Sequence, residues 1–190
     1  MKRILLSSIA LFLFLSLNAQ VKLTRLTADP ASTKLEWKGE KVLGQHSGTV
    51  NLKSGWITLE NNQVTSGEFI IDMPSIEDSE DNQKLEGHLK SDDFFGVQKF
   101  PESKLVLTGS TPFDKGIGTV TGNLTIKDVT NPLEFKASIQ KKDNGTYFFS
   151  RITVDRAKYN IKYGSGSFFD NLGDKTIYDE FELKISLLMK

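Results

Sequence analysis

The 190-residue chain contains no cysteine and only two histidines, His46 and His88. Without cysteine the protein has no disulfide, no thiol redox chemistry and no lipid-anchored N-terminal cysteine, so its stability must come from packing and backbone pairing. The two histidines are far apart, and neither has a second ligand at the close spacing of a structural zinc site. A metal site formed by both histidines with Asp72 or Asp92 would have to bring together His46 and His88, which are distant in sequence. We therefore expect no metal and no cofactor.

An excess of positive charge is also missing, because 24 basic residues are balanced by 24 acidic ones. A chain without an excess of basic side chains binds phosphate groups poorly, which argues against nucleic acid as a partner.

The acidic stretch at Glu77, Asp78, Glu80 and Asp81 resembles a calcium loop in composition. It lacks the alternate-position ligands and the terminal glutamate of such a loop. We predict a solvated loop there.

Only one long apolar run occurs, from Ile4 to Leu17, directly after two basic residues. A charged start, a short apolar core and a small residue at Ala19 are typical of a secretory signal peptide. The sequence thus predicts a signal peptide over residues 1–19, cleaved near Ala19, and a periplasmic or secreted protein. The run is shorter than the about 20 residues of a spanning helix, so no stable membrane insertion is expected, although an uncleaved anchor is the alternative. Residues 20–190 suit one domain.

Beyond this segment the chain alternates apolar and polar residues, the pattern of half-buried strands. Pro74 is expected to end a strand, Asn131-Pro132 to form a turn, and Asp143-Asn144-Gly145 predicts a hairpin turn. About eight strands joined by short turns favour a single antiparallel sheet, and closure into a barrel would remove its exposed edges. An eight-stranded barrel encloses either one small ligand or its own packed side chains. The predicted extended runs are 34–42, 47–53, 56–60 (resumed after a turn or bulge at Gly55), 64–73, 103–108, 117–127, 133–139, 147–154 and 177–189.

A helical insert near residues 82–96 interrupts this alternation. Leu85, His88 and Leu89 stand at i, i+3 and i+4, which places them on one helix face. Ser91 followed by two aspartates is typical of an N-cap with an acidic first turn, so a helix is expected to begin there. Such an insert either plugs the barrel or lines a pocket.

The same insert offers a second interpretation, in which His88 and Asp92 act as an acid/base pair with Ser91 close by. No nucleophile elbow or glycine turn for an oxyanion accompanies them. Helix capping explains the spacing without catalysis. A hydrolase-like enzyme acting on an apolar substrate is therefore the alternative, and a non-enzymatic protein is the prediction.

A set of short motifs is spread along the whole chain. They are Trp37-Lys38-Gly39, Gly44-Gln45-His46-Ser47-Gly48, Gly67-Glu68-Phe69-Ile70-Ile71-Asp72-Met73, Gly87-His88-Leu89-Lys90-Ser91-Asp92-Asp93-Phe94-Phe95, Lys99-Phe100-Pro101, Gly122-Asn123-Leu124-Thr125-Ile126-Lys127, Asp155-Arg156 and Ile177-Tyr178-Asp179-Glu180. Together these motifs resemble the YceI-like family. The resemblance implies an exported bacterial protein with an extended, lipocalin-like antiparallel β-barrel, and some members bind a long polyisoprenoid in an apolar channel. One departure is Gly96, where the family usually has aspartate, and it is expected to loosen the backbone beside the insert.

These observations predict an exported binding protein that sequesters or carries an isoprenoid-like lipid in its barrel. The alternatives are the enzyme above and a structural or stress-related barrel with a filled interior. Whether the barrel forms a homodimer is left open. Adjacent phenylalanine pairs such as Phe168-Phe169 are expected to put one ring inside and one outside. The predicted apolar lining is Phe69, Ile71, Met73, Phe94, Phe95 and Phe100, with His46, His88 and Lys90 as candidates for contact with a polar head group.

Overall fold

The computed structural model describes residues 22–190, and the predicted signal peptide with its cleavage site lies outside the described residues. Within residues 22–190, nine strands, one α-helix and three short 3-10 helices follow one another. The strands are β1 (Leu23–Thr27), β2 (Lys34–Lys41), β3 (Gly44–Glu60), β4 (Gln63–Asp78), β5 (Glu102–Ser110), β6 (Ile117–Ile126), β7 (Val129–Lys142), β8 (Gly145–Asp155) and β9 (Ile177–Met189). The helices are α1 (Gln83–Lys90), η1 (Pro30–Ser32), η2 (Arg156–Tyr159) and η3 (Gly173–Lys175).

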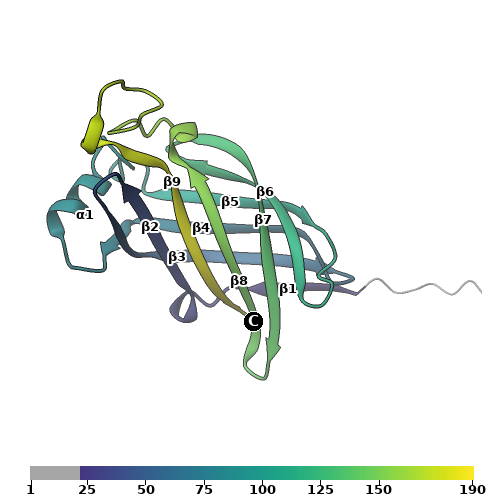
Figure 1. Cartoon of the computed structure of the whole chain (residues 1–190). Helices are drawn as coiled ribbons and strands as arrows, with labels where there is room; N and C mark the ends of the chain where they lie inside the picture. The colour runs from purple at the N-terminus through teal and green to yellow at the C-terminus, as the bar shows by residue number, and fades with distance from the viewer. Residues whose placement is uncertain (1–21) are drawn as a thin grey trace, which may run out of the picture.

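Strands β2 to β9 form a closed, eight-stranded antiparallel barrel, which confirms the predicted fold class (Figure 1). Sequential strands from β2 to β9 pair with their neighbours, and β2 pairs with β9 to close the sheet. The ninth strand, β1, pairs with one half of β3 (residues 56–60), while β2 pairs with the other half (residues 44–50). The closed sheet surrounds a single core of inward-facing apolar side chains.

The prediction that Pro74 ends a strand is wrong, because β4 continues to Asp78. The pairing of β3 with β4 shifts between Asn51, opposite Asp72, and Thr49, opposite Glu77. Pro74 lies in this interruption, where a residue without an N–H breaks no ladder hydrogen bond.

The Asn131-Pro132 pair does not form a turn either. The β6–β7 turn lies at Lys127-Asp128, whose φ values of 49° and 59° are those of a tight hairpin turn. Pro132 sits inside β7, opposite Asn123 of β6. It is tolerated because β8 pairs with β7 only from Ala137 onward, so the missing N–H faces no partner strand. The predicted hairpin at Asp143-Asn144, by contrast, is confirmed.

Gly48 allows β2, β3 and β4 to pack closely where they meet. It pairs with Trp37 of β2, whose indole Nε1–H donates to the Glu77 carbonyl at 3.1 Å. A Cβ on Gly48 would lie 1.8 Å from that same carbonyl oxygen and 2.7 Å from the Trp37 ring. Both neighbours are held in place, so only glycine fits here.

Gly48→Ala is therefore expected to lower the free energy of unfolding by about 2–3 kcal/mol, the usual cost of forcing an atom into a packed site. Urea denaturation of the purified variant measures the change. Gly39→Ala is the matched control on the neighbouring strand, because a Cβ at Gly39 would meet no atom within 4 Å. Equal unfolding midpoints for the two variants would contradict this account of Gly48.

Candidate functional site

The barrel encloses a cavity of about 390 Å³, a size typical of small-molecule sites. Inward-facing side chains from all eight barrel strands line it, together with residues of α1 and of the segment after α1. Most of these side chains are aliphatic or aromatic. The cavity therefore offers an apolar surface to a ligand of similar character.

One end of the cavity is closed. Phe113 and Phe148 meet edge to face there, with ring centroids 6.2 Å apart. Asn62, in the β3–β4 turn, holds Phe113 through two hydrogen bonds to its backbone, at 2.7 and 3.0 Å. Val64 and Phe148, which line the cavity at this end, are buried.

At the opposite end the cavity reaches the surface, since several of its lining residues there are exposed. Figure 1 shows α1 and the segment between β8 and β9 at this end. The exposed lining residues are Glu40, Lys41, Tyr163, Tyr178 and Glu180. The polar side chains of the cavity are concentrated here, so the cavity runs from a polar mouth to an apolar closed end.

Helix α1 contributes its predicted face to this mouth. Asn82 is the N-cap, and its side-chain oxygen accepts from the Leu85 N–H at 3.1 Å. Leu85, His88 and Leu89 all line the cavity, which confirms that they share one face.

The expectation that Ser91 begins a helix is wrong, because Ser91 ends α1. Its N–H and its hydroxyl both donate to the His88 carbonyl, at 3.1 and 2.8 Å. The residues after it form turns, and Gly96 adopts a left-handed φ of 56°. The Gly96 N–H donates to the Ser91 carbonyl at 2.8 Å, and its own carbonyl accepts from Phe100, so the turn around Gly96 is closed by hydrogen bonds.

Lys127, at the β6–β7 turn, connects the segment that follows α1 to the barrel through hydrogen bonds. Its Nζ donates to the carbonyls of Asp92 and Phe94, at 3.0 and 2.7 Å. Burial lowers the pKa of the Lys127 ammonium below its usual value, although the nearby aspartates oppose this. These two hydrogen bonds hold in place the backbone from which the side chains of Phe94 and Phe95 enter the cavity.

Most of the predicted ligand-lining residues do lie along the cavity. Phe94 is buried and contacts the His88 ring edge to face, and Phe95 meets Phe181 of β9 in the same way. The predicted residues brought together in the lining are Phe69, Ile71, Met73, Phe94, Phe95, His46 and His88.

Phe100 and Lys90 lie outside the lining. Phe100 is on the far side of the Gly96 turn, where its ring would be 3.4 Å from a Cβ at Gly96. Lys90 is the last residue of α1, one position beyond the cavity-facing Leu89, and the helical rotation turns it away. The residue types of Phe100 and Lys90 suit a ligand site, but periodicity alone does not determine which way their side chains point.

The geometry around His88 gives no support to the acid/base pair considered from the sequence. Asp93, not Asp92, is the carboxylate beside the ring, 3.6 Å from Nε2. Asp92 instead faces Lys99 at 3.8 Å. The Ser91 hydroxyl is committed to a backbone carbonyl, and the His88 ring packs between Phe94 and Tyr163.

The acidic stretch before α1 is only partly the solvated loop expected. Glu77, Glu80 and Asp81 are exposed, but Asp78 is 4% exposed and lies at the end of β4. Within residues 22–190, no group of three or more histidine, aspartate or glutamate side chains is placed to hold a metal ion. The described part of the chain also has no helix long and apolar enough to cross a membrane.

Arg156 is a structural centre of the mouth, because it is buried there and holds several backbone segments together. The periodicity of the sequence did not predict this role. Arg156 is 4% exposed, and four of its five N–H groups donate to backbone carbonyls. Burial lowers the pKa of its guanidinium, whereas the charges of Asp179 and Asp155 act in the opposite direction. The accepting carbonyls are those of Ile161, Tyr163, Ile177 and Tyr178, and the Asp179 carboxylate forms an ion pair with the guanidinium at 3.3 Å.

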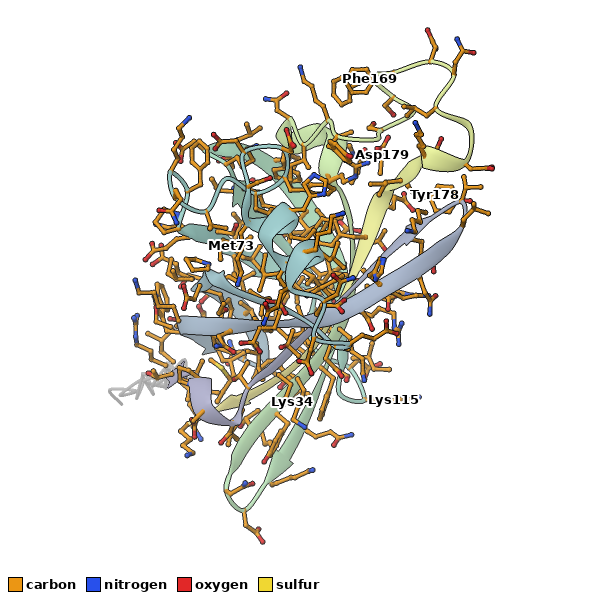
Figure 2. All side chains as sticks on the ribbon, turned by 90° about the vertical axis from the view of Figure 1, so that its left-hand side faces the viewer. Lys34, Met73, Lys115, Phe169, Tyr178 and Asp179 are labelled. Atoms are coloured by element: carbon orange, nitrogen blue, oxygen red, sulfur yellow. The ribbon has the colours of Figure 1, made fainter. Side chains whose placement is uncertain are left out.

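Large exposed side chains gather around the same mouth. Phe168 and Phe169 are 41% and 49% exposed, so the expectation that one ring of this pair lies inside is wrong. The pair belongs to the segment between β8 and β9 rather than to a strand, so strand alternation does not apply to it. Figure 2 shows Phe169 and Tyr178 at this end of the barrel. The other exposed apolar residues of this end are Val42, Leu43 and Tyr163.

Comparison with known proteins shows where the fold recurs. The family model described as the YceI-like domain matches residues 26–189. A UPF0312 protein of Pseudomonas putida strain W619 is 30% identical over 91 residues, which are 48% of this chain and 47% of that protein, so the match spans about half of this curated relative. Burkholderia cenocepacia BcnA superposes with a TM-score of 0.66 at 18% identity, over 84% of this chain and 98% of BcnA. A polyisoprenoid binding domain from Saccharophagus degradans, implicated in plant cell wall breakdown, gives a TM-score of 0.65 at 13% identity, over 87% and 97% of the two chains.

Proposed function

This chain belongs to the YceI-like family, and from that premise we propose that it is an exported protein that binds an elongated, isoprenoid-like lipid in its barrel. The observation that carries the proposal is the cavity itself, whose lining is predominantly aliphatic and aromatic and whose charged side chains lie at its mouth. The protein of Saccharophagus degradans with the same fold is described as a polyisoprenoid binding domain. The proposal makes this protein a carrier or sequestering protein, not an enzyme.

Burial of the lipid chain supplies the binding energy. Each CH₂ group removed from water contributes about 0.8 kcal/mol, so an isoprene unit of five carbons offers about 4 kcal/mol before the costs of ordering. Such binding needs no specific chemistry along the chain. Discrimination among lipids then rests on girth and length, and on whatever polar group remains at the mouth.

A lipid that fills the cavity should remain bound during purification. We expect organic extraction and mass spectrometry of the purified protein to yield an isoprenoid or a similar chain lipid, at close to one molecule per protein. An extract without lipid, together with no rise in melting temperature when prenyl lipids are added, would favour the barrel with a filled interior instead.

A further inference from the structure

His46 lies at the polar mouth beside an unfilled space. It faces inward from β3, and its cross-strand partner in β2 is Gly39. Partners in an antiparallel pair point to the same side of the sheet, so Gly39 leaves open the place next to the imidazole. A Cβ at Gly39 would meet no atom within 4 Å, and both residues line the cavity.

The carboxylate of Asp78, at the end of β4, lies beside Nδ1 of the His46 ring. The Asp78 side chain is 1% exposed, and its Oδ2 accepts from the Glu80 and Asn82 N–H groups at 3.0 and 3.4 Å. Its Oδ1 is buried and has no hydrogen-bond partner within the described chain. The Nδ1 atom of the His46 ring lies 3.8 Å from Oδ1.

The Asp78 carboxylate beside Nδ1 determines whether Nε2 of His46 donates or accepts a hydrogen bond. A carboxylate beside Nδ1 favours the tautomer that carries its proton on Nδ1, and Nε2 is then left with a lone pair. A neutral imidazole held in this way accepts a hydrogen bond from a ligand. We propose that His46 Nε2 accepts a hydrogen bond from the hydroxyl group of a prenyl alcohol whose chain lies in the cavity. This inference rests on the proposed function and specifies a hydroxyl as the head group of the bound lipid.

The charges at the mouth argue against a phosphate head group. The buried Asp78 carboxylate would repel it, and the guanidinium of Arg156 already donates four N–H groups to backbone carbonyls and pairs its charge with Asp179. The other lysine or arginine that lines the described cavity, Lys41, is exposed at the rim. An uncharged hydroxyl needs no counter-charge, so it is the head group that this end of the cavity accommodates.

The test compares geranylgeraniol with its methyl ether, which has the same chain but no hydrogen-bond donor. Binding is measured by calorimetry at about pH 8, where an imidazole in water is neutral. The wild-type protein is expected to bind the alcohol roughly three- to tenfold more tightly than the ether, the usual effect of one hydrogen bond. His46→Phe should bind both probes alike, with the affinity of the wild type for the ether.

Gln45→Phe is the matched control, because Gln45 is the exposed neighbour of His46 on β3 and should keep the preference. If His46→Phe does not fold, Gly39→Val tests the same space, since it fills the position beside the ring and should also remove the preference. Equal binding of both probes by the wild type, or a preference that survives in the folded variants, would overturn the inference and leave the proposed function standing. No binding of either probe would overturn both.

Discussion

Ala137→Trp is expected to lower the affinity for geranylgeraniol by roughly two to three orders of magnitude. Ala137 is a small, buried residue on the inward face of β7, and it lines the cavity. An indole at this position would occupy the volume of about one isoprene unit. Displacing five buried carbons at about 0.8 kcal/mol each removes about 4 kcal/mol of binding energy. Calorimetric titration of wild type and variant measures the loss.

Lys136→Trp is the control, because it adds the same ring to the exposed face of the same strand. It should leave the affinity within about twofold of the wild type. Ala137→Trp is expected to remain folded, since the ring enters an existing cavity instead of a filled core, and urea denaturation checks this. A folded Ala137→Trp variant with undiminished affinity would place the ligand somewhere other than the barrel interior.

Arg156→Met is expected to destabilise the protein by about 3–5 kcal/mol, the cost of breaking a buried, hydrogen-bonded ion pair. The substitution leaves four backbone carbonyls without their donor and the Asp179 carboxylate without its opposite charge. Burial acts to raise the pKa of Asp179, but contacts with Ser165 and Ser167 and the charge of Arg156 together hold it below its usual value. Since domains are stable by about 5–15 kcal/mol, the loss is a large fraction of the total.

Arg151→Met provides a matched comparison, because Arg151 on β8 also pairs with a β9 carboxylate, that of Glu182. This pair is on the surface, with 64% of the arginine side chain exposed, and its loss should cost less than about 1 kcal/mol. Thermal unfolding of the two variants in parallel gives the contrast. Similar melting temperatures would show that Arg156 is not a structural centre of the mouth.

Strand alternation was sufficient to predict the barrel. In β9, Phe181, Leu183 and Ile185 alternate with charged residues, and these apolar side chains line the cavity as the pattern indicates. The rules for proline failed at Pro74 and Pro132 because they describe strands paired on both sides. Whether a proline N–H is needed depends on register and on the length of the neighbouring strand, and neither is visible in the local sequence.

The site was predictable where one element supplies it and not where separate elements meet. Helical spacing placed Leu85, His88 and Leu89 correctly, because all three belong to one helix. The approach of His46 to Asp78 depends on the path of β4 beyond Pro74 and on the position of α1 behind it. Arg156 joins the start of β9 to the segment between β8 and β9, which has no periodic pattern, so only the Asp155-Arg156 motif marked it.

A crystal structure of the protein with geranylgeraniol tests the central claim most directly. The account predicts continuous density for the chain inside the barrel, from the closed end at Phe113 and Phe148 to the mouth, with the hydroxyl next to His46. Density only on the outer surface, or an interior filled by collapsed side chains, would contradict it.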